Sequence, residues 1–202
     1  MVKIAIFASG NGSNAENIIR YFKDSEDICV SVIISNNRNA YVHQRALECG
    51  IPSFTFTKEE FEKGDPVIRI LKEHEVDFIV LAGFMLKITY PLLEAYPGRI
   101  VNIHPALLPK YGGKGMYGDN VHKAVVLAKE PESGITVHYV NEHYDEGNII
   151  FQVKCDLHPD DTHDVVAQKV HALEYEYFPR VIEKVAKRAC KGYDDVIPES
   201  ML

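Results

Sequence analysis

An asparagine and a histidine stand two residues apart near the middle of the chain, in the run Ile100-Val101-Asn102-Ile103-His104. The apolar residues of this run indicate a buried strand, and alternate residues of a strand project to the same side. The Asn102 amide and the His104 imidazole can therefore act on one ligand, by donating hydrogen bonds to a developing oxyanion or by transferring a proton. The position at a strand end favours this catalytic interpretation over a purely structural histidine.

A glycine turn follows the first predicted strand. The residues Gly10-Asn11-Gly12-Ser13-Asn14 separate the apolar run 2–8 from a helical pattern of apolar residues. Backbone N–H groups in such a turn can face an anion, although a capped turn without a ligand has the same sequence. The next strand ends in Ser35-Asn36-Asn37 and not in the acidic residue that dinucleotide-binding proteins place there. The pattern therefore favours a phosphorylated small molecule over a nicotinamide dinucleotide.

The elements around these residues predict an α/β fold, in which a doubly wound, mostly parallel, Rossmann-like sheet carries helices on both faces. Three apolar runs are typical of strands buried on both faces: 2–8, 28–34 and 77–82. Shorter elements are predicted at 41–48, 66–74 and 121–128 as helices and at 54–56 as a strand. Alternating segments at 135–140 and 149–153 predict an antiparallel hairpin. Helical spacing over 162–187, with Pro179 inside it, predicts one long C-terminal helix.

An acidic turn lies inside the predicted hairpin. Asp145 begins the sequence Asp145-Glu146-Gly147, and an acidic residue followed closely by glycine is common turn chemistry. From the residue types alone, a turn is favoured over a catalytic role for Asp145.

Length, charge and cysteine usage limit the possible functions. With 202 residues, 46% hydrophobic and 25% charged, the chain has the composition of a globular protein that can bury a core. A net charge of −7 argues against a nucleic-acid partner, and no apolar stretch has the length of a membrane span. The scattered cysteines and the histidines show no metal-ligand spacing. The start of the sequence does not resemble a signal peptide, so a cytoplasmic protein is expected.

Four motifs in a fixed order carry a family resemblance: Ser9-Gly10-Asn11-Gly12-Ser13-Asn14, Ala82-Gly83-Phe84-Met85, the run 102–111 and Asp145-Glu146-Gly147. Together they resemble the phosphoribosylglycinamide formyltransferase family, folate-dependent enzymes of purine biosynthesis. The resemblance covers residues 2–187, and the Asn-x-His-Pro-x-Leu-Leu-Pro pattern of the third motif is specific to folate formyltransferases. The glycine turn followed by Ser-Asn indicates the glycinamide ribonucleotide branch.

The resemblance implies transfer of the formyl group of 10-formyltetrahydrofolate to the amine of 5-phosphoribosylglycinamide, with Asn102, His104 and Asp145 as catalytic residues. Asn102 and His104 would stabilise the tetrahedral oxyanion, and Asp145 would raise the pKa of His104 so that the imidazole is a charged donor. Residues implied to bind the substrate are Gly12, Ser13, Asn14 and Glu174. Residues implied to bind the folate are Met85, Leu86, Lys87, Ile88, Asn102, Asn141 and Asp145.

The resemblance further implies small-molecule substrates, no metal, no nucleic acid, no membrane, and a monomer or weak homodimer. No linker or repeat divides the chain, so one domain over residues 1–202 is expected. Its phosphate-binding half covers about 1–100, its folate and catalytic half about 101–190, and a tail follows at 191–202.

Three places depart from the family pattern. Leu86-Lys87 follows Met85 where relatives carry Arg directly after the Met, and no Arg near 63–65 matches one that contacts the folate in relatives. The segment 112–119 is longer than usual, and its four glycines suit a lid and a surface insertion equally. The rival functions are another folate formyltransferase, a formyltetrahydrofolate hydrolase and, in a different class, a nicotinamide-nucleotide-binding Rossmann protein.

Overall fold

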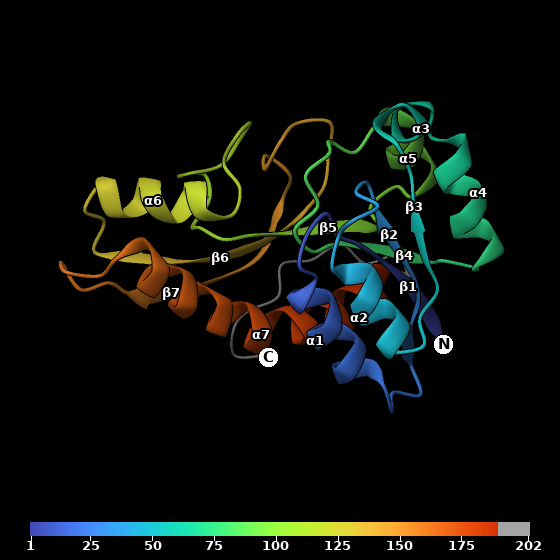
Figure 1. Ribbon diagram of the computed structural model, residues 1–202, viewed down its shortest axis with the longest axis horizontal. Coiled ribbons are helices and arrows are strands. Elements are labelled where there is room, and N and C mark those ends of the chain that lie inside the picture. The colour runs from blue at the N-terminus through green and yellow to red at the C-terminus, as the bar shows by residue number, and fades with distance from the viewer. Residues whose placement is uncertain (190–202) are drawn as a thin grey trace.

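Within residues 1–189, which the computed structural model describes, the strands form one sheet (Figure 1). Its strands are β1 (Val2–Phe7), β2 (Ile28–Ser35), β3 (Ser53–Thr55), β4 (Phe78–Leu81), β5 (Ile100–His104), β6 (Glu132–Tyr139) and β7 (Ile149–Asp156). Their order in the sheet is β3-β2-β1-β4-β5-β6-β7. The pairs from β3 to β5 are parallel, whereas β6 pairs antiparallel with both β5 and β7. The predicted tail at 191–202 and Cys190 lie outside the described residues.

Helices cover both faces of this sheet, because its central strands are apolar on both sides. In β1, Ile4 and Ile6 pack into one core cluster, and Ala5 and Phe7 pack into the other. The first cluster is covered by α1 (Ser13–Phe22), α2 (Val42–Glu48), α6 (Asp119–Leu127) and α7 (His163–Ala189). The second is covered by α3 (Lys58–Lys63), α4 (Asp65–Glu73) and α5 (Tyr90–Ala95). The predicted doubly wound, mostly parallel fold with a C-terminal antiparallel hairpin and long helix is confirmed.

Two short helices, α3 and α5, were not expected from the apolar pattern. Each of these six-residue helices buries one apolar side chain, Phe61 in α3 and Leu92 in α5. A single buried residue cannot show the spacing by which a helix is recognised in the sequence. The start of α3 did carry a signal: Thr57 and Glu60 form a capping box, in which each side chain accepts a hydrogen bond from the other residue's backbone N–H. The long helix α7 contains Pro179 in its interior, as its spacing predicted.

The centre of the sheet is a switch point in its topology. The chain proceeds from β1 to β2 and β3 on one side, and from β4 to β5 on the other. Loops leaving adjacent strands at such a point diverge and open a crevice at the carboxyl ends. Here the loops after β1 and β4 are tied together, because the Ser9 N–H donates to the Gly83 carbonyl (3.0 Å) and the Ser9 Oγ accepts the Met85 N–H (2.8 Å).

The helices of residues 1–189 include none that is both long and apolar enough to cross a bilayer. The helix α7 is long, but it runs alongside β6 and β7 (Figure 1). One side of α7 is buried through Val166, Val170, Phe178 and Val181. The length of this helix is therefore explained by packing against the hairpin and against α1.

We predict that Gly134→Ala destabilises the fold. A Cβ at Gly134 in β6 would lie 2.1 Å from the Val153 carbonyl oxygen and 2.8 Å from Leu107 Cδ2. Overpacking of this kind costs about 1–3 kcal/mol of unfolding free energy, which urea denaturation followed by circular dichroism measures. Gly10→Ala is the matched control, because nothing lies within 4 Å of its added Cβ. Equal stability of the two variants would contradict the tight contact at Gly134.

Candidate active site

A cavity of about 530 Å³ opens at the carboxyl ends of β1, β4 and β5. Its size falls in the range of small-molecule sites. Most of the predicted site residues meet there although they come from distant parts of the sequence. The lining residues are Gly10–Asn14, Ala82–Met85, Asn102–Pro105, Gly113–Gly118, His122, Tyr144, Asp145, His171 and Glu174.

The strand β5 presents Asn102 and His104 to this cavity. His104 is buried, and its Nε2–H donates to the backbone carbonyl of Tyr111 at 2.7 Å. Asn102 is half-buried, and its Nδ2 donates to Nε2 of His138 (3.0 Å) and more weakly to Oδ1 of Asp145 (3.5 Å). The two predicted side chains therefore share one cavity, and their partners fix both orientations.

Asp145 lies beside the pair, in the turn between β6 and β7. Its Oδ2 accepts the Gly113 N–H at 2.9 Å and lies 3.6 Å from His104 Nδ1. The backbone of Asp145 is left-handed (φ 57°), a conformation that Asp tolerates better than most residues. Gly147 allows the turn to close, because a Cβ there would lie 1.7 Å from the Tyr139 carbonyl oxygen. The sequence Asp145-Glu146-Gly147 is thus a turn, and it also aims a carboxylate at His104.

Burial and charge oppose each other at His104. Burial lowers the pKa of His104 below its ordinary value, while the charge of Asp145 and the hydrogen bond to Tyr111 raise it. Asp145 therefore acts on the His104 pKa in the expected direction, but in this structure burial outweighs it. At Asp145, burial acts to raise the pKa, but contacts with His138, His104 and the Gly113 N–H leave it below its ordinary value.

The glycine turn lies at the N-terminus of α1 and forms another wall of the cavity. Gly12 is left-handed (φ 74°), and a Cβ there would lie 2.5 Å from Val42 Cγ2, so only glycine fits. Ser13 and Asn14 are the first residues of α1, where unpaired N–H groups and the helix dipole favour an anion. Asn14 also reaches α7, because its Nδ2 donates to Glu174 Oε2 at 2.9 Å.

Three histidines at the site were not singled out from the sequence. His138 accepts the hydrogen bond of the Asn102 amide because the two residues lie opposite each other in β5 and β6. This pairing of strands is not visible in either segment of the sequence alone. His171 lies 2.8 Å from Glu174, and this contact raises its pKa. His122 is buried, which lowers its pKa, and its Nδ1 has no hydrogen-bond partner. The spacing of His171 and Glu174, three apart on a helix, was the one available signal.

The residues expected to bind folate lie in different surroundings. Met85 lines the cavity and is 54% exposed. Ile88 is buried in the second core cluster, and Leu86 packs against that cluster. The Lys87 ammonium lies 6.0 Å from the centre of the Tyr144 ring, and Tyr144 lines the cavity. Of Met85, Leu86, Lys87, Ile88 and Asn141, only Met85 lines the cavity, and the folate contacts of all five stay predictions.

The glycine-rich loop 112–119 covers part of the cavity. Residues 113–118 line it, and Gly113 supplies the N–H that Asp145 accepts. Left-handed glycines at Gly113, Gly115 and Gly118 give the loop its shape. The loop is therefore part of the site wall, whichever of the two expected roles it has. Within residues 1–189, no group of three or more His, Cys, Asp or Glu side chains could hold a metal ion.

Comparisons with known proteins agree with this geometry. A family model described as formyl transferase matches residues 2–182. A phosphoribosylglycinamide formyltransferase of Bacillus subtilis is 40% identical over 92% of this chain and 95% of its own length. The chain belongs to the phosphoribosylglycinamide formyltransferases.

Further members of this family are similar in sequence and in structure. A relative from Arabidopsis thaliana, named phosphoribosylglycinamide formyltransferase, chloroplastic, is 37% identical over 97% of this chain and 69% of its own length. The crystal structure of the Streptococcus pneumoniae enzyme superposes with a TM-score of 0.81 at 38% identity. This superposition covers 92% of this chain and 99% of that one, so the family fold extends over nearly the whole chain.

We predict that Asp145→Asn lowers the pKa of His104 further. The carboxylate charge is one of the groups that raise this pKa, so its removal leaves burial less opposed. A pH titration of the His104 ring signals by NMR measures the change. Asp161→Asn is the control, because Asp161 pairs with Lys169 and lies outside the cavity. An unchanged or raised pKa in Asp145→Asn would contradict the assigned interaction.

Proposed function

We propose that this chain transfers the formyl group of 10-formyltetrahydrofolate to the amine of 5-phosphoribosylglycinamide in purine biosynthesis. The observation that carries this proposal is the composition of one cavity. An anion-accepting helix N-terminus with Ser13 forms one part of it, and Asn102, His104 and Asp145 form another. A phosphorylated amine bound at the first part extends its amine toward the second, where acyl-transfer groups are placed.

The chemistry needs no covalent intermediate on the protein. The amine nitrogen forms a bond to the formyl carbon, and the formyl oxygen takes up negative charge in a tetrahedral intermediate. The Asn102 amide and the protonated His104 ring stabilise this oxyanion by hydrogen bonds. The intermediate then breaks its bond to the folate nitrogen, which takes up a proton, while the amine nitrogen loses one.

The proton balance assigns separate tasks to His104 and Asp145. Because burial lowers the pKa of His104, the ring gives up its proton readily, which suits an acid that protonates the departing folate nitrogen. Because the pKa of Asp145 is below its ordinary value, this carboxylate is ionised and can accept the amine's proton through water. Its charge also supports the protonated form of His104 once substrates exclude solvent.

The substrate phosphoribosyl group matches the other part of the cavity. The phosphate would accept hydrogen bonds from Ser13 and from backbone N–H groups near Gly12 and Asn14. The protonated form of His171 adds a positive charge there, favoured by its contact with Glu174. The buried Glu174 carboxylate would accept hydrogen bonds from the ribose hydroxyls, since a carboxylate is a pure acceptor.

The folate would occupy the wall that contains Met85, Asn102 and Asp145. We include Leu86, Lys87, Ile88 and Asn141 in this proposal as neighbours of that wall, through backbone groups or after a change in side-chain position. Two expectations stay predictions: that the protein is cytoplasmic, and that it is a monomer or weak homodimer.

An assay with both proposed substrates tests the function. We expect deformylated folate to accumulate only when 5-phosphoribosylglycinamide and 10-formyltetrahydrofolate are both present, which absorbance of the folate product reports. His104→Ala should lower kcat by roughly 10²-fold or more, because it removes an oxyanion donor and the acid. His158→Ala, in an exposed turn, is the matched control. Turnover with water or another amine in place of the ribonucleotide would overturn the proposal.

The phosphate assignment has its own test in Ser13→Ala. We expect this variant to raise the KM for 5-phosphoribosylglycinamide while kcat and the KM for the folate stay near wild type. The physical reason is that Ser13 at the start of α1 meets the phosphate and not the reacting carbon. Steady-state kinetics with each substrate varied in turn measures kcat and the two KM values separately. An effect confined to the folate KM would contradict the assignment.

A further inference from the structure

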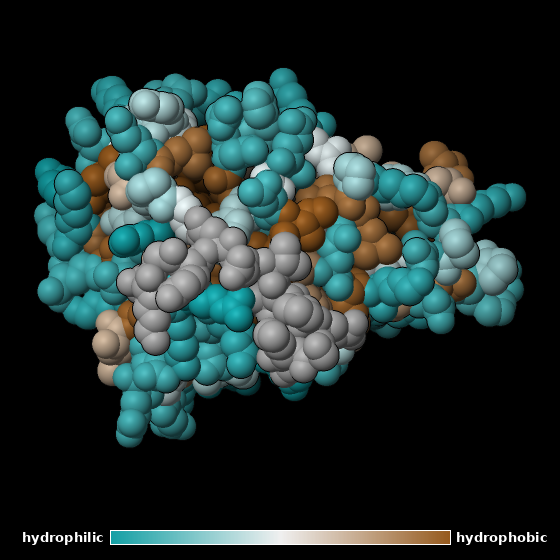
Figure 2. All heavy atoms as spheres, turned by 180° about the vertical axis from the view of Figure 1, so that it is seen from behind, coloured by the Kyte–Doolittle hydropathy of each residue, from teal (hydrophilic) through white to brown (hydrophobic). Residues whose placement is uncertain are grey.

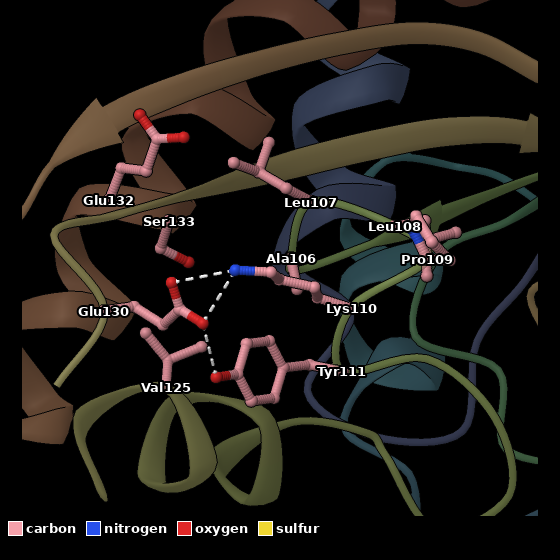
Figure 3. A pocket seen from close by; sticks show the side chains of 10 residues that line it. All are labelled: Ala106, Leu107, Leu108, Pro109, Lys110, Tyr111, Val125, Glu130, Glu132 and Ser133. Carbon is pink, nitrogen blue, oxygen red and sulfur yellow. Dashed lines mark hydrogen bonds and ion pairs between the residues drawn. The ribbon is translucent and has the colours of Figure 1, made fainter. Parts of the chain in front are cut away.

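A second cavity of about 240 Å³ lies behind the loop that follows β5 (Figure 3). Residues 106–111 form one side of it, and Glu130, Glu132 and Ser133 form the opposite side. The loop 106–111 also borders the catalytic residues, because Pro105, which precedes it, lines the first cavity, and Tyr111 at its end contacts His104. Contacts made on the rear side of this loop can therefore act on His104.

The rear side contains a small polar network centred on Glu130. The Tyr111 hydroxyl donates to Glu130 Oε1 at 2.9 Å, and Lys110 Nζ donates to the two carboxylate oxygens at 3.0 and 3.1 Å. Figure 3 shows these three contacts converging on the Glu130 carboxylate. The Glu130 side chain is only 19% exposed, whereas Lys110 is 67% exposed. The hydrogen bond from Tyr111 to Glu130 is therefore better shielded from solvent than the ion pair between Lys110 and Glu130.

The front side of the same tyrosine contacts the catalytic imidazole. The Tyr111 carbonyl accepts the His104 Nε2–H at 2.7 Å. Tyr111 is left-handed at φ 57°, a conformation that a bulky residue adopts only when its surroundings hold it there. Glu130 thus fixes the hydroxyl end of the Tyr111 side chain, while the backbone carbonyl of Tyr111 faces His104.

We propose that Tyr111 and Glu130 are positioning residues, which together hold the Tyr111 carbonyl against His104 Nε2 and so select the ring tautomer of the catalytic histidine. This inference rests on the proposed function only where it takes His104 as the acid that protonates the folate nitrogen. A carbonyl oxygen can only accept, so Nε2 must carry a proton in this contact. The nitrogen that gains and loses the catalytic proton is then Nδ1, which lies 3.6 Å from Asp145 Oδ2.

The network keeps its hydrogen bonds over the working pH range. The contacts with Lys110 and Tyr111 lower the pKa of Glu130, so the carboxylate stays ionised. Burial and the contact with Glu130 raise the pKa of the Tyr111 hydroxyl, so it stays a donor. The groups that act on His104 itself are Asp145, His138 and Glu174, together with the Tyr111 carbonyl. Glu130 acts on His104 through Tyr111 and not by its own charge.

The experiment is a comparison of ring tautomers by NMR. The full chain is labelled with ¹⁵N histidine, and His104 is assigned by its loss in His104→Ala. Above the pKa of His104, we expect wild type to show a protonated Nε2 and an unprotonated Nδ1. In Tyr111→Phe and in Glu130→Ala the two nitrogen signals should move toward each other, because the carbonyl no longer holds one tautomer.

Two further variants distinguish the hydrogen bond that Glu130 accepts from the negative charge that it carries. Glu130→Gln keeps an acceptor for the Tyr111 hydroxyl, so we expect the wild-type tautomer to be retained. Glu132→Gln removes a nearby ion pair with Lys154 that does not reach Tyr111, and it should leave the His104 signals unchanged. A wild-type tautomer in both Tyr111→Phe and Glu130→Ala, or loss of the tautomer in Glu130→Gln, would overturn the proposal.

Kinetics then connects the tautomer to turnover. We expect kcat of Tyr111→Phe to fall by roughly tenfold, since small displacements of catalytic groups cost up to about 10²-fold. Its KM for the ribonucleotide should stay near wild type. The limb of the pH profile that reports His104 should move to lower pH, because one contact that raises its pKa is weakened. The NMR result stands without any turnover, so failure of the proposed function and failure of this inference are distinguishable.

Discussion

The antiparallel register between β5 and β6 is the constraint on which the site depends. It places Asn102 opposite His138 and His104 opposite Thr136. Because side chains alternate along a strand, a slip of one residue would turn His138 away from Asn102. The same register anchors the loop after β5, since the Thr136 hydroxyl accepts the Leu108 N–H at 3.0 Å. One pairing of strands thus positions the amide, the imidazole and the loop behind them.

The site combines two opposing electrostatic requirements. A histidine that gives up a proton readily is obtained by burial, and a carboxylate that stays ionised while partly buried needs several donors. Asp145 accepts the Gly113 N–H and, more weakly, the Asn102 amide, and the His104 and His138 rings each lie 3.6 Å from its carboxylate. Its turn brings the carboxylate to the cavity from a strand pair that is not part of the parallel sheet. The antiparallel extension of the sheet therefore supplies the carboxylate that lies beside His104.

Local patterns were enough to predict the parts of the site that depend on one segment. Strand alternation predicted that Asn102 and His104 face one cavity, and the glycine turn predicted a helix start at Ser13. The role of His138 depends on strand register, which is a contact between segments and leaves no mark in either one alone. The Tyr111 carbonyl is equally hidden, because any residue type supplies that backbone group. The helix α3 was predictable from its capping box but not from its short apolar pattern.

The hydrogen bond between Asn14 and Glu174 joins residues separated by 160 positions. During synthesis from the N-terminus, the glycine turn and the Asn102–His104 strand are complete long before α7 leaves the ribosome. Until then the Asn14 amide has no partner and one wall of the cavity does not exist. The nascent chain can therefore form most of its sheet before the wall that α7 supplies is present. A ligand that contacts His171 and Glu174 in this wall would favour the state in which α7 is docked.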